Sequence, residues 1–257
     1  MHIKKALLRL AAVGLTAGVT VFAPAGVFAM EAEGGSVEHA NVDVANIPSL
    51  QRGARNFVNY CMGCHSAKFV RYNRLARDLD LSEKQVVENL MFTGERPFDT
   101  MQNAMPVAQA RAWFGNPPPD LSLIARSRGV DYLYSFLKSF YLDPTRPTGV
   151  NNLMLPGAAM PHVLWELQGF QKAVYEGETD AQGNVHKTFK GFEQATKGKL
   201  PPEEFDLFVR DTVNFLSYIG EPVQLQRRNL GFRVLGFLFV FFLFAYFLKK
   251  EIWKDVK

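Results

Sequence analysis

The chain has 257 residues, of which 47% are hydrophobic and 21% charged, with a formal net charge of +4. Most of the basic excess lies near the two ends of the chain, which argues against a nucleic-acid-binding protein.

Residues 1–29 are predicted to be an export signal that is removed after Ala29. Basic residues begin this segment, an apolar stretch follows over residues 6–22, and residues 27–29 form a small-residue cleavage site. The alternative is a first membrane anchor. The apolar stretch is short and interrupted by glycines and a proline, so cleavage is the prediction we favour.

Residues 30–228 are predicted to form one exported domain. With the charges before residue 30 and after residue 228 removed, the domain holds 21 Lys and Arg against 23 Asp and Glu. This near balance permits a basic protein partner but does not require one.

A helix is predicted to begin at Ser49, as its N-cap, and to end at a pentapeptide motif. Apolar residues recur at helical spacing up to Cys61, and Gly53 would allow another backbone to approach closely. The motif is Cys61-Met62-Gly63-Cys64-His65, the C-x-x-C-H signature of covalent haem attachment. The two thiols would add to the haem vinyl groups, and His65 would be the proximal iron ligand.

Cys61 and Cys64 have three alternative interpretations: a redox-active dithiol, a structural disulfide and half of a zinc site. A thioredoxin-like dithiol belongs in a βαβ setting, which the pattern does not show. A zinc site needs further ligands, and the other four histidines are scattered. Because His65 has no role in these alternatives, the motif indicates a haem protein.

The rest of the domain is predicted to be mainly helical, with long loops wrapped around the haem. Strand signals are scarce. Helices are expected from Ser82, from Asp120 or Ser122 to about residue 128, over residues 131–141, and from residue 201 to Gly220. A long ordered loop is expected over residues 143–161, and a polar surface insertion with a turn over residues 176–200.

Residues 229–249 are predicted to be a single transmembrane anchor, followed by a short tail, residues 250–257. Residues 234–248 are uncharged and rich in Phe and Leu. A helix of this length, at about 1.5 Å per residue, approaches the roughly 30 Å hydrocarbon core of a bilayer. With an export signal at the other end, we expect the domain outside and the tail inside the cell.

The sixth iron ligand decides what such a haem does, because an open iron binds gases or peroxide and a six-coordinate one mainly transfers electrons. Met105 and Met160 are the main candidates, since each lies in an Ala-Met-Pro sequence, and His162 is a rival. Arg126, with Arg128 as an alternate, is the candidate partner for the haem propionates.

The chain resembles the cytochrome c1 family, the haem subunits of quinol–cytochrome c oxidoreductase (bc1) complexes. The motifs that carry the resemblance, besides the haem motif and the terminal anchor, are Asn116 with Pro118-Pro119-Asp120-Leu121-Ser122, Arg126, Tyr141, Pro147-Thr148-Gly149, Pro156-Gly157 and Ala159-Met160-Pro161. In order and spacing they cover about residues 45–257.

The resemblance implies one covalent haem c with His65 and Met160 as axial ligands and Arg126 at a propionate. It places Asn116, Pro118 and Tyr141 at the haem cleft and assigns no catalytic residue. Some bacterial relatives have an extra disulfide. This chain has no cysteine left for one, so what holds the Met160 loop is open.

The implied function is a non-catalytic electron carrier in the bacterial inner membrane, single-pass, with its haem domain in the periplasm and its C-terminus in the cytoplasm. The implied partners are cytochrome b, the Rieske iron–sulfur protein as donor and a soluble or membrane-tethered c-type cytochrome as acceptor, in a dimeric complex. The alternatives are an anchored cytochrome that feeds a terminal oxidase or reductase, and a haem enzyme or gas sensor with an open iron.

Overall fold

The computed structural model describes residues 37–179 and 185–255; the predicted export signal lies outside them. Helices dominate the described residues, as predicted. They are α2 (Ile47–Tyr60), α3 (Tyr72–Asp78), α4 (Glu83–Asn89), α5 (Val107–Phe114), α6 (Ile124–Arg128), α7 (Val130–Lys138), α8 (Trp165–Gln168), α9 (Pro202–Gly220) and α10 (Gln224–Ile252). The strands are β1 (Ala67–Arg71), β2 (Thr100–Met101), β3 (Phe140–Leu142), β4 (Val150–Asn152), β5 (Gln171–Thr179) and β6 (Val185–Gln194).

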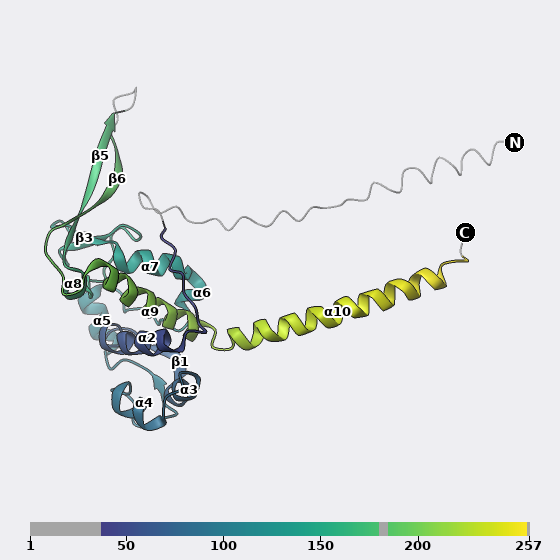
Figure 1. The fold of residues 1–257 in the computed structure, drawn as a ribbon. Helices are drawn as coiled ribbons and strands as arrows, with labels where there is room; N and C mark the ends of the chain where they lie inside the picture. The colour runs from purple at the N-terminus through teal and green to yellow at the C-terminus, as the bar shows by residue number, and fades with distance from the viewer. Residues whose placement is uncertain (1–36, 180–184, 256–257) are drawn as a thin grey trace. The chain divides into compact units, whose positions relative to one another are not determined.

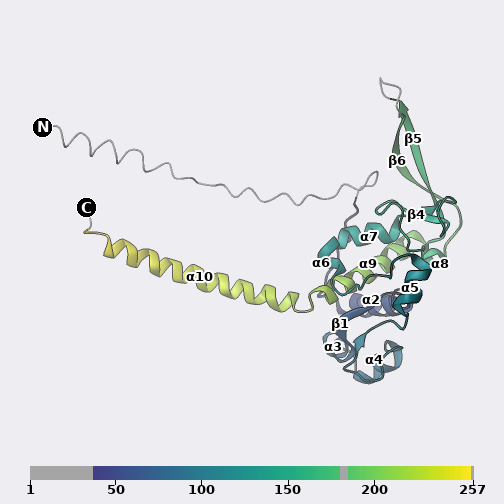
Figure 2. The same ribbon diagram turned by 180° about the vertical axis from the view of Figure 1, so that it is seen from behind.

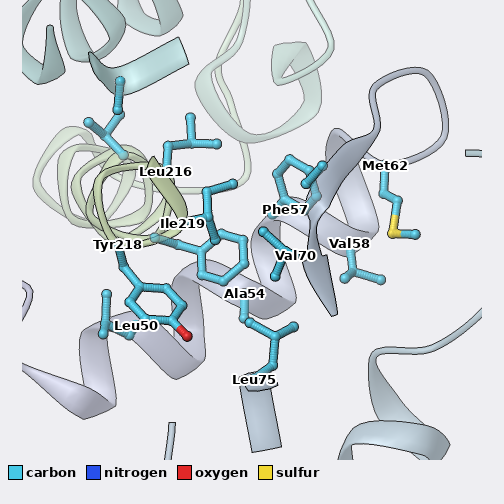
Figure 3. Packing of buried hydrophobic residues seen from close by; sticks show 14 of the residues in the cluster. Leu50, Ala54, Phe57, Val58, Met62, Val70, Leu75, Leu216, Tyr218 and Ile219 are labelled. Carbon is cyan, nitrogen blue, oxygen red and sulfur yellow. The ribbon is translucent and has the colours of Figure 1, made fainter. Parts of the chain in front are cut away.

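Helices α2 and α9 lie side by side at the centre of the core (Figure 1). Their apolar faces meet: Figure 3 shows Leu50, Ala54 and Phe57 of α2 against Leu216 and Ile219 of α9. A Cβ atom on Gly53 would lie only 2.1 Å from the Asp211 carbonyl oxygen, so the close backbone approach predicted at Gly53 is confirmed.

A buried polar cluster fixes the same helix pair near the start of α2. The Asp211 carboxylate, on α9, accepts hydrogen bonds from the Ser49 hydroxyl (2.6 Å) and from Arg52 Nε (2.6 Å). The predicted cap at Ser49 is therefore wrong, because its hydroxyl bonds across to α9. Asn46 is the N-cap instead, its side chain accepting from the Ser49 amide.

Helices α6 and α7 pack one after the other along α9 (Figure 2). The prediction that Asp120 or Ser122 caps α6 is wrong. Their side chains accept hydrogen bonds from backbone amides of β1 instead. The helix predicted over residues 131–141 ends at Lys138, and the chain continues as β3. The helix start predicted at Ser82 is confirmed, with a complete capping box. The helix predicted from residue 201 is also confirmed, with Pro201 as its N-cap and Pro202 as its first residue.

Three antiparallel strand pairs add β structure that the sequence did not indicate. Strand β1 pairs with β2, β3 with β4, and β5 with β6. The β3–β4 pair lies within what was predicted as helix end and loop, and the β5–β6 hairpin covers most of the predicted polar insertion, whose expected turn at residues 180–184 lies outside the described residues. The Gln171 side chain fixes the base of this hairpin by donating to the Lys138 and Phe140 carbonyls.

Helix α10 is long and apolar enough to cross a membrane, with a mean hydropathy of 2.1 over its most apolar window. It begins at Gln224, five residues before the predicted anchor, and ends at Ile252. The first turns therefore carry polar residues ahead of the apolar run.

Candidate functional site

The haem motif forms one further helical turn beyond α2. The amides of Cys61 and Met62 donate to the Phe57 carbonyl, and the amide of His65 donates to the Cys61 carbonyl at 2.8 Å. Cys61, Cys64 and His65 are spaced i, i+3 and i+4, so this turn places all three side chains on one side. Met62 points the other way and is 3% exposed in the core (Figure 3).

Both cysteines are free thiols held next to apolar surface. Burial raises the pKa of Cys61 to about 12, with a further contribution from Cys64, and burial also raises the pKa of Cys64. These thiols are therefore protonated at neutral pH and lack the lowered pKa of a reactive redox dithiol. The raised pKa values of both thiols argue against the thioredoxin-like alternative.

The His65 ring is oriented by a backbone carbonyl. Its Nδ1 lies 2.7 Å from the Pro119 oxygen, and because a carbonyl can only accept, Nδ1 carries the proton. Nε2 is then left with a free lone pair for a metal, which is the arrangement that typically orients a metal-binding histidine. Burial lowers the pKa of His65, against smaller opposing effects of Pro119 and Asp120, so the ring is neutral as a ligand must be.

The segment after Pro119 is fastened to the chain that follows His65. Asp120 Oδ2 accepts from the Lys68 amide at 3.0 Å, and the Ser122 hydroxyl accepts from the Phe69 amide at 3.1 Å. The Leu121 amide donates back to the Ser66 carbonyl at 2.8 Å. These bonds hold the Pro119 carbonyl in place, which gives the Pro-Pro-Asp-Leu-Ser sequence a physical role: it fixes the orientation of the His65 ring.

A cavity of about 340 Å³ opens in front of these residues. Its walls are mostly apolar side chains from α2, α6, α7, α9 and the loop before α8. Six of the eight predicted cofactor-binding residues line it: Cys61, Cys64, His65, Asn116, Pro118 and Met160. An apolar cavity with a few polar groups is typical of a cofactor site.

The two candidate methionines are separated by the structure. Met160 lines the cavity, whereas Met105 is outside its wall. The segment before Met105 bonds instead to the backbone around the haem motif, since Asn103 donates from its side chain to the Cys64 carbonyl and from its amide to the Ser66 hydroxyl. The placement favours Met160 as the second axial ligand.

The two predicted arginines also differ in place. Arg126, the first choice, is outside the cavity wall and 59% exposed, and its guanidinium lies 3.4 Å from the Glu221 carboxylate. Arg128, the alternate, lines the cavity, with its guanidinium 5.8 Å from the centre of the Tyr132 ring. The geometry favours Arg128 as the cation at the cavity.

Two further candidates face other parts of the molecule. Tyr141 is in β3 and not in the cavity wall; burial and a hydrogen bond with Tyr175 raise its pKa to about 12. His162 stacks on Phe140 with ring centres 5.1 Å apart, and burial lowers its pKa to about 4. It is a neutral core residue, and the rival ligation by His162 receives no support.

Several cavity residues were not identified from the sequence. Tyr132 and Phe136 on α7, and Thr212 and Leu216 on α9, form much of the wall. Both helices were predicted, but an apolar helix face that contacts a cofactor has the same sequence pattern as one that contacts a protein core.

The donor set fits a haem c. Two thiols with the right spacing, a neutral imidazole oriented by a carbonyl, a thioether and an arginine surround one apolar cavity. Among the described residues there is no cluster of three His, Cys, Asp or Glu side chains that could hold a metal ion by itself. The predicted zinc alternative therefore gains nothing from the structure.

Comparison with known proteins adds an independent finding. Residues 39–184 and 200–256 match the sequence profile of the family described as "Cytochrome C1 family". The chain is 48% identical to "Cytochrome c1" of Allochromatium vinosum, over 89% of this chain and 93% of that protein. It is 45% identical to "Ammonia monooxygenase gamma subunit" of Nitrosomonas europaea, over 86% and 88%. A 27% identity to "Cytochrome b/c1" of Bradyrhizobium diazoefficiens covers 80% of this chain and 33% of that protein.

Proposed function

The chain belongs to the cytochrome c1 family, and from this premise we propose that its cavity holds one haem c, bound covalently through Cys61 and Cys64 and ligated by His65 and Met160. Family membership makes the protein an electron-transfer haem subunit of a bc1 complex, and α10 fits a membrane anchor. The observation that carries the site assignment is the single cavity that contains both thiols, His65 and Met160.

When bound, the haem supplies a one-electron redox couple. The residues of the chain have supporting roles. The Pro119 carbonyl keeps the His65 proton on Nδ1, and the mostly apolar residues of α7 and α9 in the cavity wall give the haem an apolar surrounding. A thioether ligand and an apolar surrounding both favour the reduced iron and raise its potential. Arg128 is the proposed partner of a propionate, in place of Arg126.

We propose the Rieske iron–sulfur protein as the electron donor and a soluble or membrane-tethered c-type cytochrome as the acceptor, with no bond-making on this chain. Cytochrome b is the proposed neighbour of α10; the fused name of the Bradyrhizobium relative supports this pairing. We propose further that the complex is dimeric and that the export signal is cleaved after Ala29. Residues 30–228 would then lie in the periplasm and residues 250–257 in the cytoplasm.

A second function has one observation in its favour. A relative with 45% identity is named as the gamma subunit of an ammonia monooxygenase. An anchored cytochrome of this kind would serve a membrane enzyme other than a bc1 complex, as does the alternative of a subunit that donates to a terminal oxidase or reductase. The site would be unchanged, and only the neighbours would differ.

Purification from native membranes in mild detergent distinguishes the two functions. A bc1 subunit should co-elute with b-type haems and an iron–sulfur signal, and the preparation should oxidise quinol in a turnover reaction that antimycin inhibits. A c-type haem that elutes alone, or with an oxidase or monooxygenase, would refute the bc1 proposal and leave the haem site intact.

A further inference from the structure

The loop that carries Met160 begins at a buried asparagine. Asn152 is the last residue of β4, pairs with Phe140 of β3, and is fully buried, with 0% of its surface exposed. The chain then runs from residue 153 through the cavity-lining residues Leu155 and Ala158 to Met160. Asn152 is therefore the point at which the loop leaves regular structure.

The Asn152 side chain is hydrogen-bonded on both its oxygen and its nitrogen. Oδ1 accepts from the amides of Met154 (2.9 Å) and Leu155 (3.1 Å) and from the Ser139 hydroxyl (3.2 Å). Nδ2 donates to the Phe136 carbonyl at 2.8 Å. Burying an amide is costly unless its polar atoms are paired, and here each is.

These bonds connect two segments of the cavity wall. Phe136 lines the cavity from α7, and Leu155 lines it from the Met160 loop. A single side chain thus sets the position of the loop relative to α7. With an apolar residue at position 152, the amides of Met154 and Leu155 would lose their acceptor in the interior. The Phe136 carbonyl would keep only the longer bonds from the Ser139 amide (3.3 Å) and hydroxyl (3.4 Å).

A second set of bonds holds the loop closer to Met160. Gly157, at φ +80°, donates its amide to Asn151 Oδ1 at 2.8 Å, and its carbonyl accepts from the Arg146 guanidinium at 2.9 Å. Asn151 in turn donates to Asp143 at 2.9 Å. Asn152 therefore holds the start of the loop at Met154 and Leu155, and Asn151 holds it at Gly157, three residues before Met160.

We propose that Asn152 is a positioning residue for Met160, which keeps the thioether in reach of the iron by locking the loop to α7. This inference rests on the ligation by Met160 proposed above. Asn152 is fully buried and outside the cavity wall, so its effect must act through the loop.

The test compares three variants in the full complex: Asn152→Ala, Ser139→Ala and Asn214→Ala. Asn214 is the matched control, an asparagine that is 1% exposed and donates to the Asp43 carbonyl and the Ser49 hydroxyl, away from the Met160 loop. The readouts are the methionine-to-iron charge-transfer band, the midpoint potential, carbon monoxide affinity and the apparent melting temperature.

Asn152→Ala should lose most of the charge-transfer band, lower the potential and bind carbon monoxide about tenfold tighter or more, since it removes four hydrogen bonds. Ser139→Ala removes one of them and should change carbon monoxide affinity by roughly two- to tenfold. Asn214→Ala should lower the melting temperature and leave band, potential and affinity as in the wild type. If Asn152→Ala does not accumulate as folded protein, the single-bond variant at Ser139 decides.

Two results would overturn the inference. One is a folded Asn152→Ala protein whose charge-transfer band, midpoint potential and carbon monoxide affinity equal those of the wild type. If Asn152→Ala does not fold, the same result for Ser139→Ala would overturn the inference. The other is the same loss in Asn214→Ala, which would mean that any loss of stability releases the ligand. Failure of the proposed function looks different: the wild-type protein would then lack the band, or Met160→Ala would retain it.

Discussion

Gly53→Ala tests the helix packing that delivers the haem motif. The new Cβ would lie 2.1 Å from the Asp211 carbonyl oxygen and 2.7 Å from the Phe215 Cβ, and neither contact can be relieved by a flexible side chain. An ordinary contact begins near 3.4 Å, so α2 and α9 would have to separate by roughly 1 Å at this point. The movement would also stretch the bonds of Asp211 to Ser49 and Arg52.

The expected magnitude follows from two opposing effects. Overpacking a core typically costs about 1–3 kcal/mol, and a clash with backbone belongs at the upper end. Alanine is favoured over glycine within a helix by about 1 kcal/mol, which offsets part of the loss. The net destabilisation is therefore about 2 kcal/mol, or roughly 4–8 °C in melting temperature for a domain of this size.

The assay is thermal unfolding of the full-length protein in detergent, followed by circular dichroism. Arg55→Ala is the control, an exposed position on the same helix, and should stay within about 0.5 kcal/mol of the wild type. A Gly53→Ala protein that melts at or above the wild-type temperature would show that the two helices do not pack this closely.

The other predictions concern the ligands, the loop behind His65 and the response to acid. Met160→Ala should lose the methionine-to-iron band, lower the potential and admit carbon monoxide, and Met105→Ala should change none of these in the same spectra. Asp120→Ala removes the acceptor for two backbone amides, which should cost about 1–3 kcal/mol in thermal unfolding. Burial raises the pKa of Asp78, but hydrogen bonds from two arginines and Tyr218 outweigh it and bring the pKa below 3.8. The stability from this pairing is therefore present above that value and is lost as the pH falls through the lower folded pKa, a loss that melting curves of Asp78→Asn should not show.

Each of these has a contrary outcome. If Met105→Ala loses the methionine-to-iron band, Met105 and not Met160 is the axial ligand. An Asp120→Ala protein as stable as the wild type would remove the proposed support for the Pro119 carbonyl. An Asp78→Asn protein with an unchanged acid transition would mean that other carboxylates dominate unfolding at low pH.

Local sequence signals predicted the parts of the molecule that depend on neighbouring residues. The haem motif needs its thiols and imidazole within one helical turn, so its spacing alone identified it. The capping box at Ser82 and the proline and acids that start α9 are also local, and both helix starts are confirmed. Gly53 was interpretable because only a close approach explains a glycine inside an apolar stripe.

The features that were missed depend on residues far apart in the chain. Ser49 was predicted as a cap, but its hydroxyl bonds to Asp211, 162 positions later. The β5–β6 hairpin is polar and exposed, so its strands lack the alternating apolar pattern that identifies one. The choice between Arg126 and Arg128, two residues apart on a short helix, depends on which one faces the cavity, which only the packing of α6 decides.

The central claim is that one haem between His65 and Met160 relays electrons from quinol to an acceptor. Rapid mixing of the purified complex with quinol, followed by an oxidised c-type cytochrome, measures it directly through the absorbance of the c-type haem. The haem should become reduced and then be reoxidised at the rate at which the acceptor is reduced, and a chain with Cys61→Ser and Cys64→Ser should abolish both steps. Two results would contradict the relay. One is acceptor reduction at the wild-type rate in the doubly substituted complex, and the other is acceptor reduction by a complex whose c-type haem stays oxidised throughout.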